Sequence, residues 1–190
     1  MSTIDAVLEF WFGPDPHDPP QDRQQRWFGK VDGFDDEIRE RFGETWQQAA
    51  EGGLSEWEQS PSGAMALVLV LDQFSRNLWR GDPRSWSQDE RVRGVMRRAL
   101  DAGYAEELSP HELWFLMLPL MHSEHLPDQD EAVQRYTALR DAGGPDAVKW
   151  AVAHRDIVAR FGRFPHRNAV LGRESTAEEV SFLQEPGSSL

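Results

Sequence analysis

Two stretches of the chain are apolar around the whole circumference of a helix. Residues 64–71 read AMALVLVL, and residues 113–121 read LWFLMLPLM. A helix without a polar face must be surrounded by protein, so both stretches predict buried helices. A Ser-Pro pair precedes each stretch, at residues 60–61 and 109–110, as is typical of an N-cap followed by the first helical turn. We expect Pro119 to kink the second helix.

The rest of the chain shows one-sided helical periodicity, with apolar residues three or four positions apart. These amphipathic segments cover residues 3–12, 23–30, 35–51, 87–102, 127–142, 146–161 and 175–184. No segment alternates apolar and polar positions as a half-buried strand does. The pattern predicts an all-α fold of eight or nine helices in stacked antiparallel pairs, forming one domain over residues 1–190.

Both apolar helices become polar at their C-terminal ends. The polar residues are Asp72, Gln73, Arg76 and Asn77 on the first, and His122, Ser123, Glu124 and His125 on the second. A charged group at the end of a buried helix lowers the stability of the fold unless it pairs with an opposite charge, so an unpaired one indicates a functional role. The helix macrodipole also disfavours a carboxylate near a C-terminus. We therefore expect the two polar ends to converge on one polar region.

A third segment, residues 154–173, is basic in an otherwise acidic chain. It carries five arginines and one acid, Asp156, whereas the whole chain of 190 residues has a formal charge of −13. Guanidinium groups bind carboxylate or phosphate through paired hydrogen bonds. The predicted ligand-binding residues are Gln73, Arg76, Asn77, Glu124, His154, Arg163, His166, Arg167 and Asn168. The candidates for proton transfer are Asp72 and His122.

Structural explanations compete with each of these assignments. Asp72 and Arg76 lie four residues apart and could form a private ion pair. His154 lies on an apolar helix face, as a hydrogen-bonded core histidine does. The arginines could simply neutralise residues 1–60, whose net charge is −9. His122 and His125 could chelate a metal, but the H-E-x-x-H spacing is missing, so we expect no metal and no cofactor.

Composition and missing motifs argue against several classes of partner and enzyme. The acidic charge argues against nucleic acid and anionic membrane as partners. Cysteine is absent, and the N-terminus lacks the basic region of a signal peptide, so a cytoplasmic protein is expected. Phosphate-binding glycine loops and the G-x-S-x-G motif are also absent. We expect the eight tryptophans to fill the core between helices.

Several phrases resemble one known family. These are VLEFWFG (7–13), RWFGK (26–30), LVLDQFSRNLWRGDPR (69–84), LPLMHSEHLPDQ (118–129) and HRDIVARFGRFPHRNAVLGRESTAEEVSFL (154–183). The chain resembles the bacterial domain-of-unknown-function 924 family over nearly its whole length. The resemblance implies an all-α fold similar to tetratricopeptide-repeat proteins and carries no established activity. Ser75 and Trp79 stand where the family pattern has Pro and Phe, and we expect serine to let the helix continue smoothly.

Three hypotheses follow for the polar region. It binds a small anionic ligand, with or without acting on it; or the chain is a peptide- or protein-binding helical scaffold; or the cluster only holds two buried helices in register. The residues distinguish neither an enzyme from a binding protein nor a monomer from an oligomer.

Overall fold

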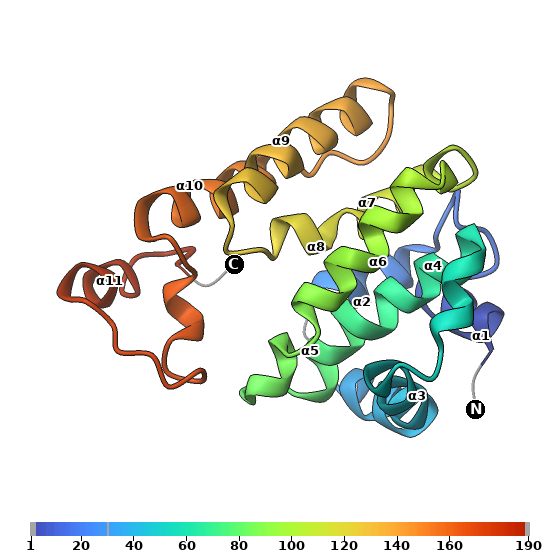
Figure 1. The fold of residues 1–190 in the computed structure, drawn as a ribbon, viewed down its shortest axis with the longest axis horizontal. Coiled ribbons are helices and arrows are strands. Elements are labelled where there is room, and N and C mark those ends of the chain that lie inside the picture. The colour runs from blue at the N-terminus through green and yellow to red at the C-terminus, as the bar shows by residue number, and fades with distance from the viewer. Residues whose placement is uncertain (1–2, 30, 189–190) are drawn as a thin grey trace.

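The computed structural model describes residues 3–29 and 31–188, and all regular secondary structure in them is helical (Figure 1). The α-helices are α1 (Ile4–Phe12), α2 (Gln21–Phe28), α3 (Phe34–Glu51), α4 (Pro61–Val68), α5 (Ser75–Leu78), α6 (Asp89–Asp101), α7 (Pro110–Leu116), α8 (Leu118–Met121), α9 (Leu126–Asp141), α10 (Val148–Phe161) and α11 (Ala177–Phe182). A π-helical turn joins α4 to α5, and α7 and α8 form one broken rod. Counted as rods, these residues contain nine helices, which confirms the all-α prediction.

The buried rod that begins at α4 lies at the centre of the packing. α4 contacts α1, α6 and α7, and α3 packs against the π-helical turn and α5. On the other side, α8 contacts α6 and α9, and α9 packs along α10 (Figure 1). Every residue from 64 to 71 is buried, as the apolar pattern predicts. The tetratricopeptide-like arrangement stays a prediction.

Aromatic side chains fill much of this core. Phe10 and Trp11 of α1 contact the ring of Phe74, and Trp11 meets Phe115 of α7 edge to face. A second, smaller apolar cluster of Ile157, Val158 and Phe164 lies at the end of α10. Trp150 departs from the expectation of core tryptophans, because its side chain is 53% exposed on α10.

The expectation that the helix continues smoothly past Asp72 is wrong in one respect. Residues Leu69–Phe74 form a π-helical turn, and the helix ends at Leu78. Ser75 follows the turn: its hydroxyl donates to the Leu71 carbonyl (2.6 Å) and accepts from Trp46 Nε1 (2.7 Å). The helix therefore continues past Ser75, but only after a wider turn of a kind often found at functional sites.

The break between α7 and α8 confirms the kink expected from Pro119. Proline has no N–H to donate to the carbonyl four residues earlier, so the α-helical ladder is interrupted one turn before it. α7 ends at Leu116, and α8 begins at Leu118. His122 follows directly after α8, as its C-cap residue.

Two helical glycines give a test of the packing. A Cβ at Gly63 would lie 2.2 Å from the Trp57 carbonyl oxygen, whereas a Cβ at Gly43 would meet nothing within 4 Å. Gly63→Ala should therefore destabilise the protein by about 1–3 kcal/mol, the usual cost of overpacking. Gly43→Ala should stabilise it by about 0.5–1 kcal/mol, because alanine favours a helix. Urea unfolding of both variants measures these changes, and equal shifts of the same sign would contradict the packing of α4.

Candidate functional site

The Asp72 carboxylate lies at the centre of a polar network inside the helical core. Its side chain is 1% exposed. Oδ1 accepts a hydrogen bond from His122 Nδ1 (2.9 Å) and lies 3.0 Å from Arg76 Nη1, and Oδ2 accepts from Gln73 Nε2 (2.6 Å). The ends of the two apolar rods thus meet at one carboxylate, across 50 residues of sequence. Asp72 and Arg76 are members of a larger network rather than a private pair.

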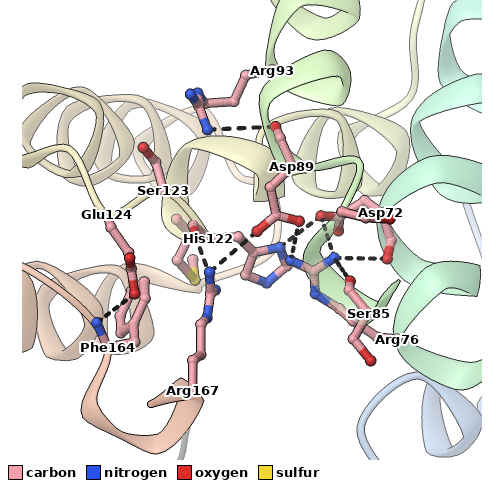
Figure 2. A network of polar contacts seen from close by, with 12 residues as sticks. Asp72, Arg76, Ser85, Asp89, Arg93, His122, Ser123, Glu124, Phe164 and Arg167 are labelled. Atoms are coloured by element: carbon pink, nitrogen blue, oxygen red, sulfur yellow. Dashed lines mark hydrogen bonds and ion pairs between the residues drawn. The ribbon is translucent and has the colours of Figure 1, made fainter. Parts of the chain in front are cut away.

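Asp89, in the first turn of α6, extends this network to the C-terminal part of the chain. Arg76 Nη2 donates to Asp89 Oδ1 (3.1 Å), and Arg167 Nη1 donates to Asp89 Oδ2 (3.2 Å). Arg167 Nη2 also donates to the backbone carbonyl of His122 (3.0 Å). Figure 2 shows Asp89 between the two guanidinium groups. Two carboxylates and two guanidinium groups therefore balance in charge within the network.

A cleft of about 350 Å³ opens beside these side chains. It is lined by residues from the 3₁₀ turn before α6, from α6 itself, from the turn after α8 and from the segment after α10. These residues are Pro83, Trp86, Ser87, Asp89, Glu90, Arg93, His122, Ser123, Glu124, His125, Arg167 and Leu171. Asp72 and Arg76 lie behind His122 and Asp89 and do not line the cleft. The cleft thus presents the outer members of the network.

His122 is oriented by Asp72 and presents its other nitrogen to no protein group. With Nδ1 bonded to Asp72, Nε2 has no hydrogen-bond partner among the described residues. Burial and the nearby Arg76 lower the pKa of His122, and Asp72 counteracts them only in part. Burial alone would raise the pKa of Asp72, but Arg76 and His122 lower it well below its usual range. The pair is therefore a carboxylate and a neutral imidazole at neutral pH.

Arg167 combines deep burial with an incomplete set of partners. Its side chain is 7% exposed, and its guanidinium lies 4.6 Å from the Phe164 ring centroid and 5.5 Å from that of Trp86. Burial lowers the pKa of Arg167 to about 10, although Asp89 acts in the opposite direction. Its Nε is buried without a hydrogen-bond partner in the described part of the chain. Arg167 stays charged at neutral pH and is held at the cleft wall.

Glu124 lines the cleft and contacts Phe164, whose ring lies beside two further histidines. Glu124 accepts two hydrogen bonds from Arg173 (2.7 and 2.9 Å) and one from the Phe164 backbone N–H (2.8 Å). His154 donates from Nδ1 to the Trp150 carbonyl (2.8 Å), and its ring lies 6.3 Å from that of His122. The His166 ring lies 5.6 Å from the Phe164 ring, measured between centroids. Neither histidine lines the cleft.

The structure places three other predicted residues away from the cleft. Arg163 Nε and Nη2 donate to the two carboxylate oxygens of Glu179 (2.6 and 2.8 Å) and so anchor α11. Asn168 is buried and donates to Ser175 Oγ (3.0 Å). Asn77 donates to Asp35 of α3 (2.7 Å). These interactions fix neighbouring segments, and none of the three residues lines the cleft.

Sequence reasoning missed Trp86, Asp89 and Arg93. Asp89 resembles an ordinary acidic residue in the first turn of a helix, and Arg93 resembles an outward-facing charge of the same helix. Arg93 is in fact only 18% exposed and lies 3.3 Å from Asp128. No local signal marks these residues, because their roles depend on how α6 packs against the turn after α8.

No group of three or more His, Asp or Glu side chains with metal-binding geometry occurs in the described ranges. No helix within these ranges has the length and apolar character needed to cross a membrane.

Comparison with known proteins places the chain in a family. The family model described as "Bacterial protein of unknown function (DUF924)" matches residues 7–187. The chain belongs to this family. A solved structure of a protein of unknown function from Agrobacterium tumefaciens is 34% identical, with a TM-score of 0.83 over 95% of this chain and 96% of that one. No curated protein matches the chain. The resemblance seen in the sequence motifs is thereby confirmed.

The buried histidines predict how the stability of this DUF924 protein depends on pH. Burial and the proximity of His122 lower the pKa of His154 to about 3, and burial and Arg167 lower that of His166 to about 4. In the unfolded chain a histidine has a pKa of about 6.5, so below that pH the unfolded state takes up protons that the folded state does not. The free energy of unfolding should therefore fall as the pH drops from 7 to 5.

In His154→Gln the decrease in the free energy of unfolding between pH 7 and pH 5 should be smaller by about 2 kcal/mol. This is the contribution of one histidine that titrates in the unfolded chain but whose folded pKa lies well below pH 5. His17→Gln, at an exposed position, is the matched control and should keep the wild-type pH dependence. Urea unfolding at pH 5, 6 and 7 gives the comparison. A fall in His154→Gln as large as in the wild type would show that His154 takes up its proton in the folded protein.

Proposed function

We propose that the cleft binds a small molecule with an anionic group and that His122 accepts a proton from that molecule. One observation carries the proposal: a buried carboxylate, Asp72, holds His122 Nδ1, while Nε2 has no partner in the described residues and His122 lines a cleft. A histidine held in this way by a carboxylate is the usual arrangement of a general base.

The electrostatics support a base rather than an acid. A general base must be unprotonated at the working pH, and burial together with Arg76 lowers the pKa of His122. When Nε2 takes up a proton, the Asp72 carboxylate at 2.9 Å from Nδ1 stabilises the resulting imidazolium. Asp72 itself stays ionised because Arg76 remains beside it.

The anionic group of the ligand would be received by arginine at the cleft wall. Arg76 lies behind the cleft between Asp72 and Asp89, and Arg163 is paired with Glu179. Neither residue lines the cleft. We therefore assign binding of the anionic group to Arg167, and Arg93 is a second cationic residue of the lining. Arg167 donates through only two of its three nitrogens in the described structure, and its contacts with the Phe164 and Trp86 rings help to hold the guanidinium in place.

The architectural alternative is supported by a different observation. The charges of Asp72, Arg76, Asp89 and Arg167 balance within the network, as they would if the cluster only fixed the helices in register. A network of this kind is destabilised by losing one member, at about 3–5 kcal/mol for a buried pair. Both ideas predict an unstable Asp72→Asn variant, so stability alone does not separate them.

His122→Asn separates the two ideas. The asparagine amide can occupy the place of Nδ1 and donate to Asp72, but it has nothing at the place of Nε2. Wild type, His122→Asn and Arg167→Lys should be screened by thermal shift against phosphorylated and carboxylated metabolites, with Arg140→Lys, at an exposed position outside both pockets, as control. We expect a ligand that stabilises the wild type and the control but binds Arg167→Lys at least about tenfold more weakly.

Turnover of that ligand, followed by NMR, should fall by a factor of about 10² or more in His122→Asn while binding persists. If no metabolite raises the melting temperature of the wild type more than that of Arg167→Lys, the cleft is not a site for anions. A ligand that binds and reacts equally in His122→Asn would exclude His122 as the base.

A further inference from the structure

A second pocket, of about 370 Å³, lies between α3 and the chain that follows α5. It is lined by Arg39, Gly43, Trp46, Gln47, Leu78, Trp79 and Arg84, and it shares no lining residue with the cleft. Its volume falls at the lower end of the range for small-molecule sites, which suits a ligand of one or two rings. α3 and α5 lie side by side along the lower edge of the molecule in Figure 1.

Two tryptophans give the pocket aromatic walls. The rings of Trp46 and Trp79 lie 5.3 Å apart between centroids and are inclined by 59°. The guanidinium of Arg84 lies 3.5 Å from the centroid of the Trp79 ring, so this ring already accepts a flat group against its face. Trp46 Nε1 donates to Ser75, but Trp79 Nε1 is buried without an acceptor in the described residues. Buried donors are normally paired, so an acceptor from outside the chain would complete this site.

The charges of the lining select an anion. Arg39 and Arg84 are its two charged residues, and both are cationic in a chain of net charge −13. Each is paired with a carboxylate, Asp36 and Asp82, at an exposed position. Exposed ion pairs contribute little to stability, so a carboxylate on a ligand can exchange with them. Arginine can hold such a carboxylate through two parallel hydrogen bonds.

Gly43 keeps the pocket open. It lies in the middle of α3, where glycine weakens a helix relative to alanine. Nothing within the described structure requires it, because a Cβ there would meet no atom within 4 Å and its φ is not positive. A larger side chain at this position would extend into the space that Trp46 and Trp79 border.

We propose that this pocket binds a planar aromatic carboxylate, with its ring against the aromatic walls of Trp46 and Trp79 and its carboxylate held by Arg84 and Arg39. The site is separate from the cleft and does not depend on the chemistry proposed for His122.

Indole-3-acetate and tryptamine test this proposal, because they share a ring and differ in the sign of their charge. Isothermal titration calorimetry at pH 7 and low salt should give a Kd below about 1 mM for indole-3-acetate and binding at least about tenfold weaker for tryptamine. Gly43→Leu, which fills the pocket, and Arg84→Gln, which removes the charge, should each weaken binding of indole-3-acetate at least about fivefold. Gly43→Ala and the exposed Arg140→Lys are the controls and should bind it as the wild type does.

Leucine favours a helix, so Gly43→Leu should fold, and its thermal melt followed by circular dichroism checks this. If that variant does not fold, Arg84→Gln and the comparison with tryptamine decide the question. Equal affinity for indole-3-acetate and tryptamine would overturn the proposal. So would wild-type affinity in a folded Gly43→Leu, or the absence of binding to the wild type at millimolar concentration.

Discussion

The structure depends on one buried charge, the carboxylate of Asp72 at the end of an apolar rod. A carboxylate with 1% exposure must be balanced within the protein, because water does not reach it. Arg76 from the next turn provides the countercharge, and His122 from the other apolar rod provides a hydrogen bond. Arg76 then requires a second acceptor, Asp89, which in turn engages Arg167. Compensation of one charge thus connects four segments that are far apart in the sequence.

The apolar packing and the polar network have complementary roles. The core around α4 positions the rods and includes Ala151 of α10. The end of α10 shares a small second cluster with Phe164, and the segment that follows reaches the cleft through polar contacts. Those contacts are Arg167 with Asp89 and Arg173 with Glu124. The cleft therefore has a polar wall at the junction of α6, the turn after α8 and the segment after α10. This favours a site for ligands at the junction.

The buried rods and the meeting of their polar ends could be predicted from the sequence. The features that could not be predicted all depend on tertiary packing. The apolar runs at residues 64–71 and 113–121 predict buried rods because periodicity reflects burial directly, and the effect of Pro119 is local. The convergence of Asp72 and His122 follows from both rods ending in polar residues. The π-helical turn, the role of Asp89 and the engagement of Arg163 with Glu179 depend on tertiary packing, which has no local signature. Arginine clustering alone did not distinguish Arg167 at the cleft from Arg163 at the base of α11.

In this structure Asp72 holds His122 as a neutral imidazole with a proton on Nδ1 and an unpartnered Nε2 among the described residues. Long-range ¹H–¹⁵N correlation NMR of the folded protein distinguishes the two tautomers and the imidazolium. At pH 7 we predict that His122 shows a protonated Nδ1 and an unprotonated Nε2, since Nδ1 lies 2.9 Å from the Asp72 carboxylate and burial disfavours a second proton. A His122 protonated on Nε2 alone, or on both nitrogens, would contradict the account.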